Sequence, residues 1–111
     1  MMVPLYQAKT ELFRALGNPV RIRVLELLYD SPKPVHRLLA EIPIEGSRLS
    51  QQLGILRGAG LVTARRDGNT VEYALSTGEV AELMATARRI LAHLATGQEE
   101  LLAELRVERA S

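Results

Sequence analysis

Apolar residues in the first third of the chain recur at the three- and four-residue spacing of amphipathic helices. The first stripe consists of Leu5, Ala8, Leu12, Ala15 and Leu16. We expect this helix to end at Gly17, because glycine readily takes the left-handed backbone that often follows a helix. Asn18 and Pro19 form a typical N-cap and first-turn pair, so the pattern predicts a second helix that reaches about Tyr29.

The middle of the chain also follows helical patterns. Residues 30–34 contain two prolines and are predicted to form a loop, and residues 35–42 are predicted to form a short third helix. Pro43 should end that helix, since a proline disfavours helical geometry in the residue before it. A fourth helix is expected over 47–58, with its buried face made of Leu49, Leu53 and Leu56.

After residue 60 the period changes from that of a helix to that of a strand. Alternating apolar positions flank the polar sequence RRDGNT, with Val62 and Ala64 before it and Val71, Tyr73 and Leu75 after it. Either Asp67-Gly68 or Gly68-Asn69 would supply the positive φ that a tight hairpin turn requires. The pattern therefore predicts a β-hairpin.

The last third of the chain is typical of two helices. An apolar stripe predicts a long helix over 77–95, and its members are Val80, Leu83, Met84, Ala87, Ile90, Leu91 and Leu94. Thr96 and Glu99 have the spacing of a capping box. Gly97 is therefore expected to separate a final helix over 97–109.

The order of these elements predicts a winged helix-turn-helix. In such folds the second helix of the pair enters the major groove of DNA, and the hairpin reaches along the DNA backbone. The predicted fold class is therefore mainly α with a β-hairpin wing. We assign residues 1–95 to a DNA-binding and dimerisation domain and residues 96–111 to a C-terminal helical extension.

The outer face of the predicted helix over 47–58 favours DNA as its partner. It carries short polar residues together with Gly54 and Gly58, where a helix that faces only water would normally have Glu, Lys or Ala. Arginine pairs well with guanine, and glutamine with adenine. The predicted DNA contacts are Ser47, Arg48, Ser50, Gln51, Gln52 and Arg57 in this helix, and Arg65, Arg66, Asn69 and Thr70 in the wing.

Composition excludes several other functions. The 111 residues include no cysteine, which excludes disulfides, thiolate metal sites and cysteine nucleophiles. No Ser-His-Asp set, glycine-rich phosphate loop or histidine pair is evident, so we do not expect an enzyme. The chain also lacks an apolar run of roughly 18 residues and the layout of a signal peptide, so we expect a cytoplasmic protein without a membrane partner.

The charge distribution adds a weak indication of where DNA binds. The net charge is only +1. Residues 1–76 carry ten Lys and Arg against seven Asp and Glu, or +3, whereas residues 77–111 carry four against six, or −2. The positive bias therefore lies with the predicted DNA-binding helix and wing.

Three segments of the chain resemble the ArsR/SmtB family of bacterial repressors. They are ELFRALGNPVRIRVLELL at the second helix, SRLSQQLGILRGAGLV at the recognition helix and ARRDGNTVEYAL at the wing, and the resemblance covers about residues 8–94. It implies a homodimer that binds an inverted-repeat operator and responds to an effector, often a metal ion. The implied interface lies on the first and last long helices, at Leu5, Leu12, Leu83, Ile90 and Leu94. Many members have a basic residue where this chain has Gly54, so the phosphate contact from that position is not expected here.

The metal site that the family forms on its last long helix has a partial counterpart in this chain. Glu79 and Glu82 precede His93 by 14 and 11 residues, which match the outer and inner spacings of the family's ligands. Thr77 and Ile90 replace two other ligands. Any metal held by such nitrogen and oxygen ligands would be Ni²⁺, Co²⁺ or Zn²⁺ rather than Cu⁺.

Several alternatives stay open on these patterns. The polar face of the fourth helix also suits a winged helix that binds another protein. The patterns leave open whether the effector is a metal ion, a small molecule or a partner protein, or whether there is no effector. His93 is better explained as part of a polar edge beside a dimer interface, and His36 suits either an exposed position or a phosphate contact.

Overall fold

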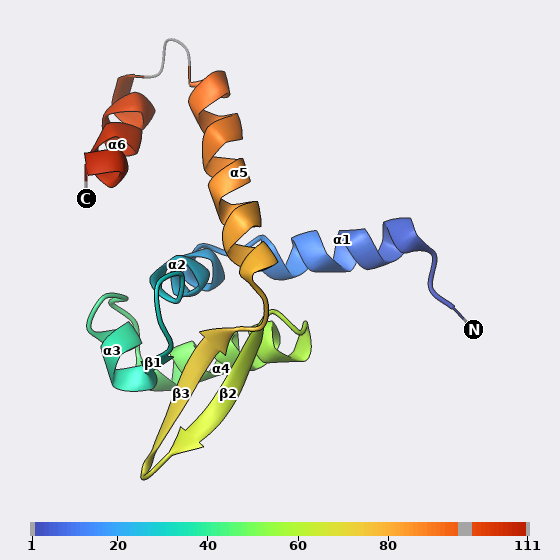
Figure 1. Ribbon diagram of the computed structural model, residues 1–111, viewed down its shortest axis with the longest axis vertical. Helices are drawn as coiled ribbons and strands as arrows, with labels where there is room; N and C mark the ends of the chain where they lie inside the picture. The colour runs from blue at the N-terminus through green and yellow to red at the C-terminus, as the bar shows by residue number, and fades with distance from the viewer. Residues whose placement is uncertain (1, 96–98, 111) are drawn as a thin grey trace. The chain divides into compact units, whose positions relative to one another are not determined.

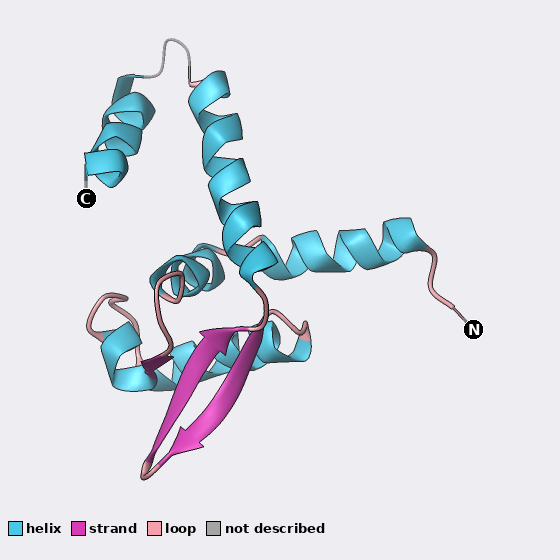
Figure 2. Ribbon diagram, viewed as in Figure 1, coloured by secondary structure: helices cyan, strands magenta, loops and turns pink. Residues whose placement is uncertain are grey.

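The computed structural model of the chain describes residues 2–95 and 99–110, which belong to two compact units, Met1–Ala81 and Glu82–Ser111. The first unit contains helices and a small sheet (Figures 1 and 2). Its helices are α1 (Leu5–Leu16), α2 (Pro19–Leu27), α3 (Val35–Leu39) and α4 (Gly46–Gly58), and its strands are β1 (Lys33–Pro34), β2 (Val62–Asp67) and β3 (Thr70–Leu75). Helix α5 (Gly78–Leu94) begins in the first unit and continues in the second, where α6 (Glu99–Ala110) follows.

The core of the first unit forms where α2, α3 and α4 meet. Its largest fully buried side chains are Val24, Leu25, Leu38, Leu49, Leu53 and Leu56. The three leucines of α4 were expected to share one buried face, and all three are fully buried. Each such side chain stabilises the fold by roughly 1.5–3 kcal/mol through the removal of apolar surface from water.

The junction of α1 and α2 differs from the prediction at Gly17. Its φ is −80°, so it does not take the expected left-handed backbone. The guanidinium of Arg21 explains the difference: Nε donates to the carbonyl of Ala15 at 2.6 Å, and Nη2 donates to that of Arg14 at 3.1 Å. A side chain from the next helix satisfies the carbonyls at the end of α1, so α1 ends without a left-handed glycine.

Helix α2 begins as predicted and ends slightly early. The Asn18 side chain accepts hydrogen bonds from the backbone N–H groups of Val20 at 2.9 Å and Arg21 at 3.1 Å. Leu27 is the last residue of the helix. The ammonium of Lys33 donates to the Leu27 carbonyl at 2.7 Å and to the Asp30 carboxylate at 2.8 Å. The hydrogen bond from Lys33 holds the pKa of Asp30 below its usual value.

Two predictions between α2 and α4 are wrong in detail. Residues 33–34, expected in a loop, form strand β1, in which Lys33 lies opposite Tyr73 of β3. A two-residue strand that contains a proline has no period to detect, and it forms because β3 offers a partner. Helix α3 ends at Leu39 rather than at residue 42, since the chain tightens into a turn in which the Glu41 N–H donates to the Leu38 carbonyl at 3.0 Å.

The hairpin forms as predicted. In the sheet β3 lies between β1 and β2, and Ala64 stands opposite Tyr73. Asp67 pairs with Thr70, which leaves a two-residue turn in which Gly68 has a φ of +63°. A positive φ at the first turn position only is typical of a type II′ turn, which matches the twist of the flanking strands.

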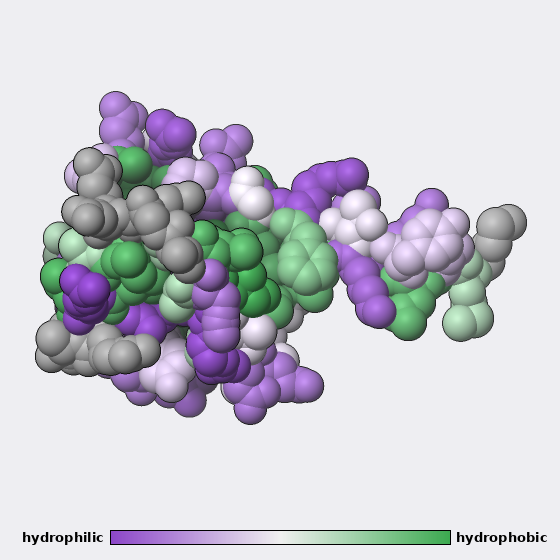
Figure 3. Space-filling view, turned by 90° about the horizontal axis from the view of Figure 1, so that it is seen from above, coloured by the Kyte–Doolittle hydropathy of each residue, from purple (hydrophilic) through white to green (hydrophobic). Residues whose placement is uncertain are grey.

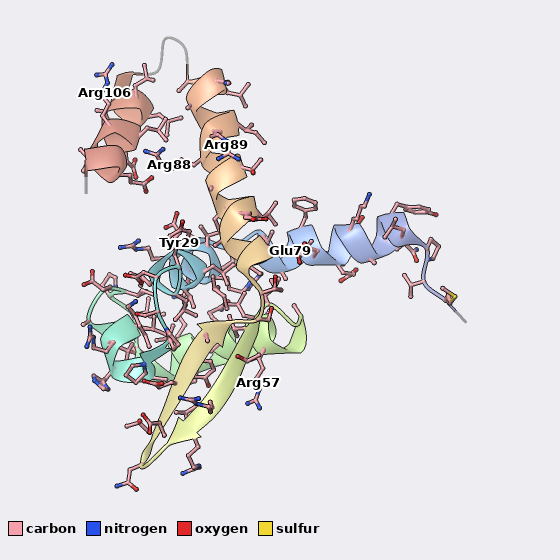
Figure 4. The ribbon with its side chains drawn as sticks, viewed as in Figure 1. Tyr29, Arg57, Glu79, Arg88, Arg89 and Arg106 are labelled. Atoms are coloured by element: carbon pink, nitrogen blue, oxygen red, sulfur yellow. The ribbon has the colours of Figure 1, made fainter. Side chains whose placement is uncertain are left out.

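The second unit consists of most of α5 together with α6. The side chain of Arg88 extends from α5 toward α6 (Figure 4), where Nε donates to the Glu108 carboxylate at 3.0 Å and Nη2 donates to the Leu105 carbonyl. Thr96 and Gly97 lie outside the described residues, and so does the side chain of Glu99, so the capping box stays a prediction. The domain boundary between residues 95 and 96 also stays a prediction.

The cap on α2 generates the first prediction. Asn18→Ala removes the acceptor of two backbone N–H groups and should lower the free energy of unfolding by about 1 kcal/mol. Urea denaturation at one fixed protein concentration measures the change. Asn69→Ala, in the exposed hairpin turn, is the matched control and should change the free energy by less than about 0.5 kcal/mol. Equal effects of the two substitutions would contradict the role of the cap.

Candidate nucleic-acid interface

The buried leucines of α4 determine which of its residues face solvent. Because Leu49, Leu53 and Leu56 point into the core, the opposite side of the helix is exposed. Of the predicted contacts in α4, the following are exposed: Ser47, Arg48, Ser50, Gln51 and Arg57. Arg57 projects from the last turn of α4 (Figure 4). The helix contains two arginines and no acidic residue, so its exposed face suits a polyanion.

Gly54 and Gly58 lie on the same exposed face. A Cβ atom added at either position would meet no atom within 4 Å, and neither residue has a positive φ. The fold of this chain therefore does not require glycine at these positions. Glycine in a helix interior costs about 1 kcal/mol relative to alanine, so Gly54 lowers the stability of the helix without a need in the fold, as the predicted close approach of another molecule would explain.

Gln52 differs from the other predicted contacts because it is half-buried. Its side-chain carbonyl accepts a hydrogen bond from Nη1 of Arg21 at 2.7 Å. The amide therefore faces α2, whereas the neighbouring Gln51 is exposed. The sequence pattern could not separate the two glutamines, because the partner of Gln52 lies 31 residues away in the chain.

Ile55 is absent from the predicted contacts although the structure places it on the exposed face. Its side chain is 42% exposed, one helical turn after Gln51. An isoleucine in an amphipathic pattern is normally assigned to the core, and only the helical phase relative to Leu53 and Leu56 would have indicated otherwise. An exposed apolar group among polar side chains suits contact with the methyl group of thymine.

The arginines of the wing extend from opposite faces of the hairpin, since successive side chains of a strand alternate. Arg66 shares its face with the buried Val62, the face that packs against α4. Arg65 lies on the other face, directly opposite Glu72 in the register. Both arginines are exposed, but only Arg66 lies on the α4 side.

The turn supplies the remaining predicted contacts, and α3 carries His36, for which a phosphate contact was an open alternative. Asn69 and Thr70 are exposed at the end of the hairpin. The Thr70 hydroxyl donates to the Asp67 carbonyl at 2.9 Å, so it supports the turn and retains its oxygen as an acceptor. His36 and Arg37 are exposed on α3, and an exposed position was one of the two alternatives for His36.

The residues predicted to hold a metal do not form a site within the chain. Among the described residues, no three histidine, aspartate or glutamate side chains gather into a group that could hold a metal ion. The Glu79 carboxylate accepts a hydrogen bond from the Thr77 hydroxyl at 3.2 Å. Glu82 and His93 are exposed on α5. A site formed by Glu79, Glu82 and His93 would therefore need two chains.

The predicted dimer residues leave apolar surface uncovered. Leu5 is exposed on α1, and Figure 3 shows apolar surface near the N-terminal end of that helix. On α5, Ile90 is 54% and Leu94 66% exposed. Leu12 and Leu83 are half-buried. Large apolar side chains are thus exposed on both helices that the family resemblance implies for the dimer.

A helix with an exposed polar face, followed by a hairpin that carries two exposed arginines, is the arrangement of a winged helix-turn-helix DNA-binding protein. The family model described as "Bacterial regulatory protein, arsR family" matches residues 18–64. The chain belongs to this family of transcriptional regulators, as its resemblance to the ArsR/SmtB family predicted. Its relatives are transcriptional regulators rather than enzymes, which confirms the prediction that the chain is not an enzyme.

Relatives and solved structures support the assignment over most of the chain. The HTH-type transcriptional regulator Rv0081 of Mycobacterium tuberculosis (strain ATCC 25618 / H37Rv) is 47% identical over 104 residues, which cover 93% of this chain and 91% of the relative. Its crystal structure matches with a TM-score of 0.80 and covers 87% of this chain and 98% of that chain. The transcriptional repressor SmtB of the same strain is 39% identical over 80 residues, 72% of this chain and 59% of the relative.

A further solved structure is described as the homodimeric winged helix-turn-helix DNA-binding domain of Mb0332 from Mycobacterium bovis. It is 28% identical to this chain, with a TM-score of 0.76, and the match covers 83% of this chain and 86% of that chain. This likeness confirms the predicted fold class. None of the helices in the described part of the chain is long and apolar enough to cross a membrane.

The open space at Gly54 generates the second prediction. Gly54→Ala should raise the free energy of unfolding by up to about 1 kcal/mol, because alanine favours the helix. The added methyl group should weaken DNA binding by roughly 1–3 kcal/mol, because it enters a closely packed interface. Thermal denaturation and fluorescence anisotropy with labelled DNA measure the two effects.

A matched control adds the same methyl group away from α4. Gly78→Ala, at the start of α5, also meets open space and should leave DNA affinity unchanged. If Gly54→Ala stabilised the protein without any loss of DNA affinity, the inference that DNA approaches α4 closely would be wrong.

Proposed function

We propose that the chain acts in the cytoplasm as a homodimeric repressor that binds an inverted-repeat operator. The exposed polar face of α4 carries this proposal, since its residue types suit base readout and its glycines do not serve the fold. The homodimeric Mb0332 domain and the repressor SmtB support the dimer and the direction of regulation.

Each part of the face has its own role in this proposal. Arg48 and Gln51 read base edges in the major groove, and Ile55 contacts a thymine methyl group. Ser47, Ser50 and Arg57 contact phosphates beside the groove. In the wing, Arg66 contacts the DNA backbone on the α4 side, whereas Arg65 lies opposite Glu72 on the other face of the hairpin.

The dimer forms through the uncovered apolar surface of α1 and α5. Burial of Leu83, Ile90 and Leu94 across a two-fold axis would contribute roughly 1.5–3 kcal/mol for each fully buried side chain. The Arg88 contacts with α6 lie on a different side of α5, about 160° around the helix from Ile90. Helix α6 therefore leaves the proposed interface accessible.

We do not assign the effector to a metal ion. The residues of one chain do not fit such a site, because Thr77 and Ile90 stand where the family has ligands and no group of three ligands forms among the described side chains. A shared site, with Glu79 or Glu82 of one chain and His93 of another, stays a prediction. A partner protein or a small molecule is the alternative effector.

Base readout generates the third prediction. In a selection from random DNA, the wild-type protein should enrich an inverted repeat, and Arg48→Ala and Gln51→Ala should each lose roughly 1–3 kcal/mol of discrimination at one position of each half-site. Arg66→Ala is the matched control, since it should weaken binding to every sequence and reduce the salt slope by about one. Enrichment of no inverted repeat by the wild-type protein would instead favour a winged helix that binds protein.

The exposed stripe of α5 generates the fourth prediction. Ile90→Glu should produce monomers that no longer bind the inverted repeat, because a buried unpaired carboxylate strongly opposes association. Analytical ultracentrifugation measures the oligomeric state. Val107→Glu is the matched control, because Val107 is 68% exposed on α6, outside the proposed interface. A dimer that withstands Ile90→Glu would place the interface elsewhere.

A further inference from the structure

The guanidinium of Arg21 connects three helices. Its Nε and Nη2 donate to the carbonyls of Ala15 and Arg14 in the last turn of α1, at 2.6 and 3.1 Å, while Nη1 donates to the side chain of Gln52 in α4 at 2.7 Å. Arg21 itself belongs to α2. We call this set of hydrogen bonds the Arg21 clamp.

The clamp is well suited to hold an orientation. A guanidinium is planar and offers its donors in a rigid fork, so three acceptors bound to it are held in a defined arrangement. The group is half-buried, where hydrogen bonds are less exposed to competition from water. Gln52 occupies the flank of α4 that faces α2, between the buried Leu53 and the exposed Gln51. The clamp therefore opposes rotation of α4 about its axis and movement of α4 relative to α1.

These two helices have different tasks in the proposed dimer. Helix α1 contributes Leu5 and Leu12 to the contact between subunits, and α4 presents Arg48 and Gln51 to the bases. The position of α4 relative to α1 therefore determines how far apart the two reading helices of a dimer stand. A dimer reads two half-sites only when this separation matches their spacing on the DNA.

We propose that the Arg21 clamp sets the half-site spacing that the dimer accepts, and that Gln52 is a positioning residue rather than a reader of bases. This inference rests on the proposed function. One base pair moves a half-site by about 3.4 Å and rotates it by about 34°. The clamp makes such a change costly, because α4 cannot turn to follow the half-site without breaking the hydrogen bond between Arg21 and Gln52.

The experiment measures affinity for a series of operators that differ only in the number of base pairs between the half-sites. The spacing penalty is the ratio of the affinity for the best spacing to the affinity for a spacing one base pair longer or shorter. In Gln52→Ala this penalty should fall at least about tenfold, the factor that corresponds to the loss of one hydrogen bond to a charged group. The base preference within each half-site should stay that of the wild type.

Two further variants distinguish positioning from base reading. Gln52→Glu keeps an acceptor for Arg21, so it should retain the wild-type spacing penalty, whereas a carboxylate in direct contact with DNA would be repelled. Gln51→Ala is the matched neighbour and should change base preference at one position without changing the spacing penalty. Thermal denaturation, run in parallel, shows that each variant is folded.

The outcomes separate this inference from the proposed function. If wild-type protein binds no inverted repeat, the proposed function fails. If wild-type protein binds one but Gln52→Ala keeps the full spacing penalty, the clamp does not set the spacing. A loss of base preference in Gln52→Ala at unchanged spacing would show that Gln52 reads a base and would overturn the inference.

Discussion

The burial of three leucines from α4 is the interaction on which the rest of the structure depends. Leu49, Leu53 and Leu56 reach zero exposure against the core residues of α2 and α3. Because these positions lie on one side of the helix, their burial fixes the rotation of α4 about its own axis. The same burial leaves the opposite face of α4 exposed, and the strands of the wing pack beside the helix. This apolar constraint thus determines which side chains of α4 face outward.

The exposed face of α4 shows a conflict between folding and binding. Alanine at Gly54 or Gly58 would stabilise the helix, and nothing in the fold opposes it. Ile55 adds a second departure, because a polar residue would suit solvent better. Positions at which the residue present lowers the stability of the fold are the positions at which a function is expected. On α4 both departures lie on the same exposed face, which marks that face more clearly than the small net charge of the chain does.

Much of the fold could be predicted because its signals are local. Helical period, the Asn18-Pro19 start of α2 and the turn glycine at residue 68 each act within a few positions, and the structure agrees with all three. The errors arose where a side chain or strand outside the local pattern supplies the hydrogen-bond partner. Gly17 keeps a negative φ because Arg21 satisfies the end of α1, and β1 exists because β3 lies beside it. Gln52 was grouped with Gln51 because only the fold brings it to Arg21.

Helix α1 joins the two properties on which the proposed regulator depends. Toward its N-terminal end it exposes apolar surface that a second subunit would cover, and its last turn is bound to Arg21 and through it to Gln52. In the proposed dimer, association and base reading would be mechanically connected through this single helix rather than through a separate linker. An effector need not touch α4 to change DNA affinity, because a ligand that binds two arrangements of the α1 contact unequally shifts the position of α4 as well. The size of that shift cannot exceed the difference in free energy with which the ligand binds the two arrangements.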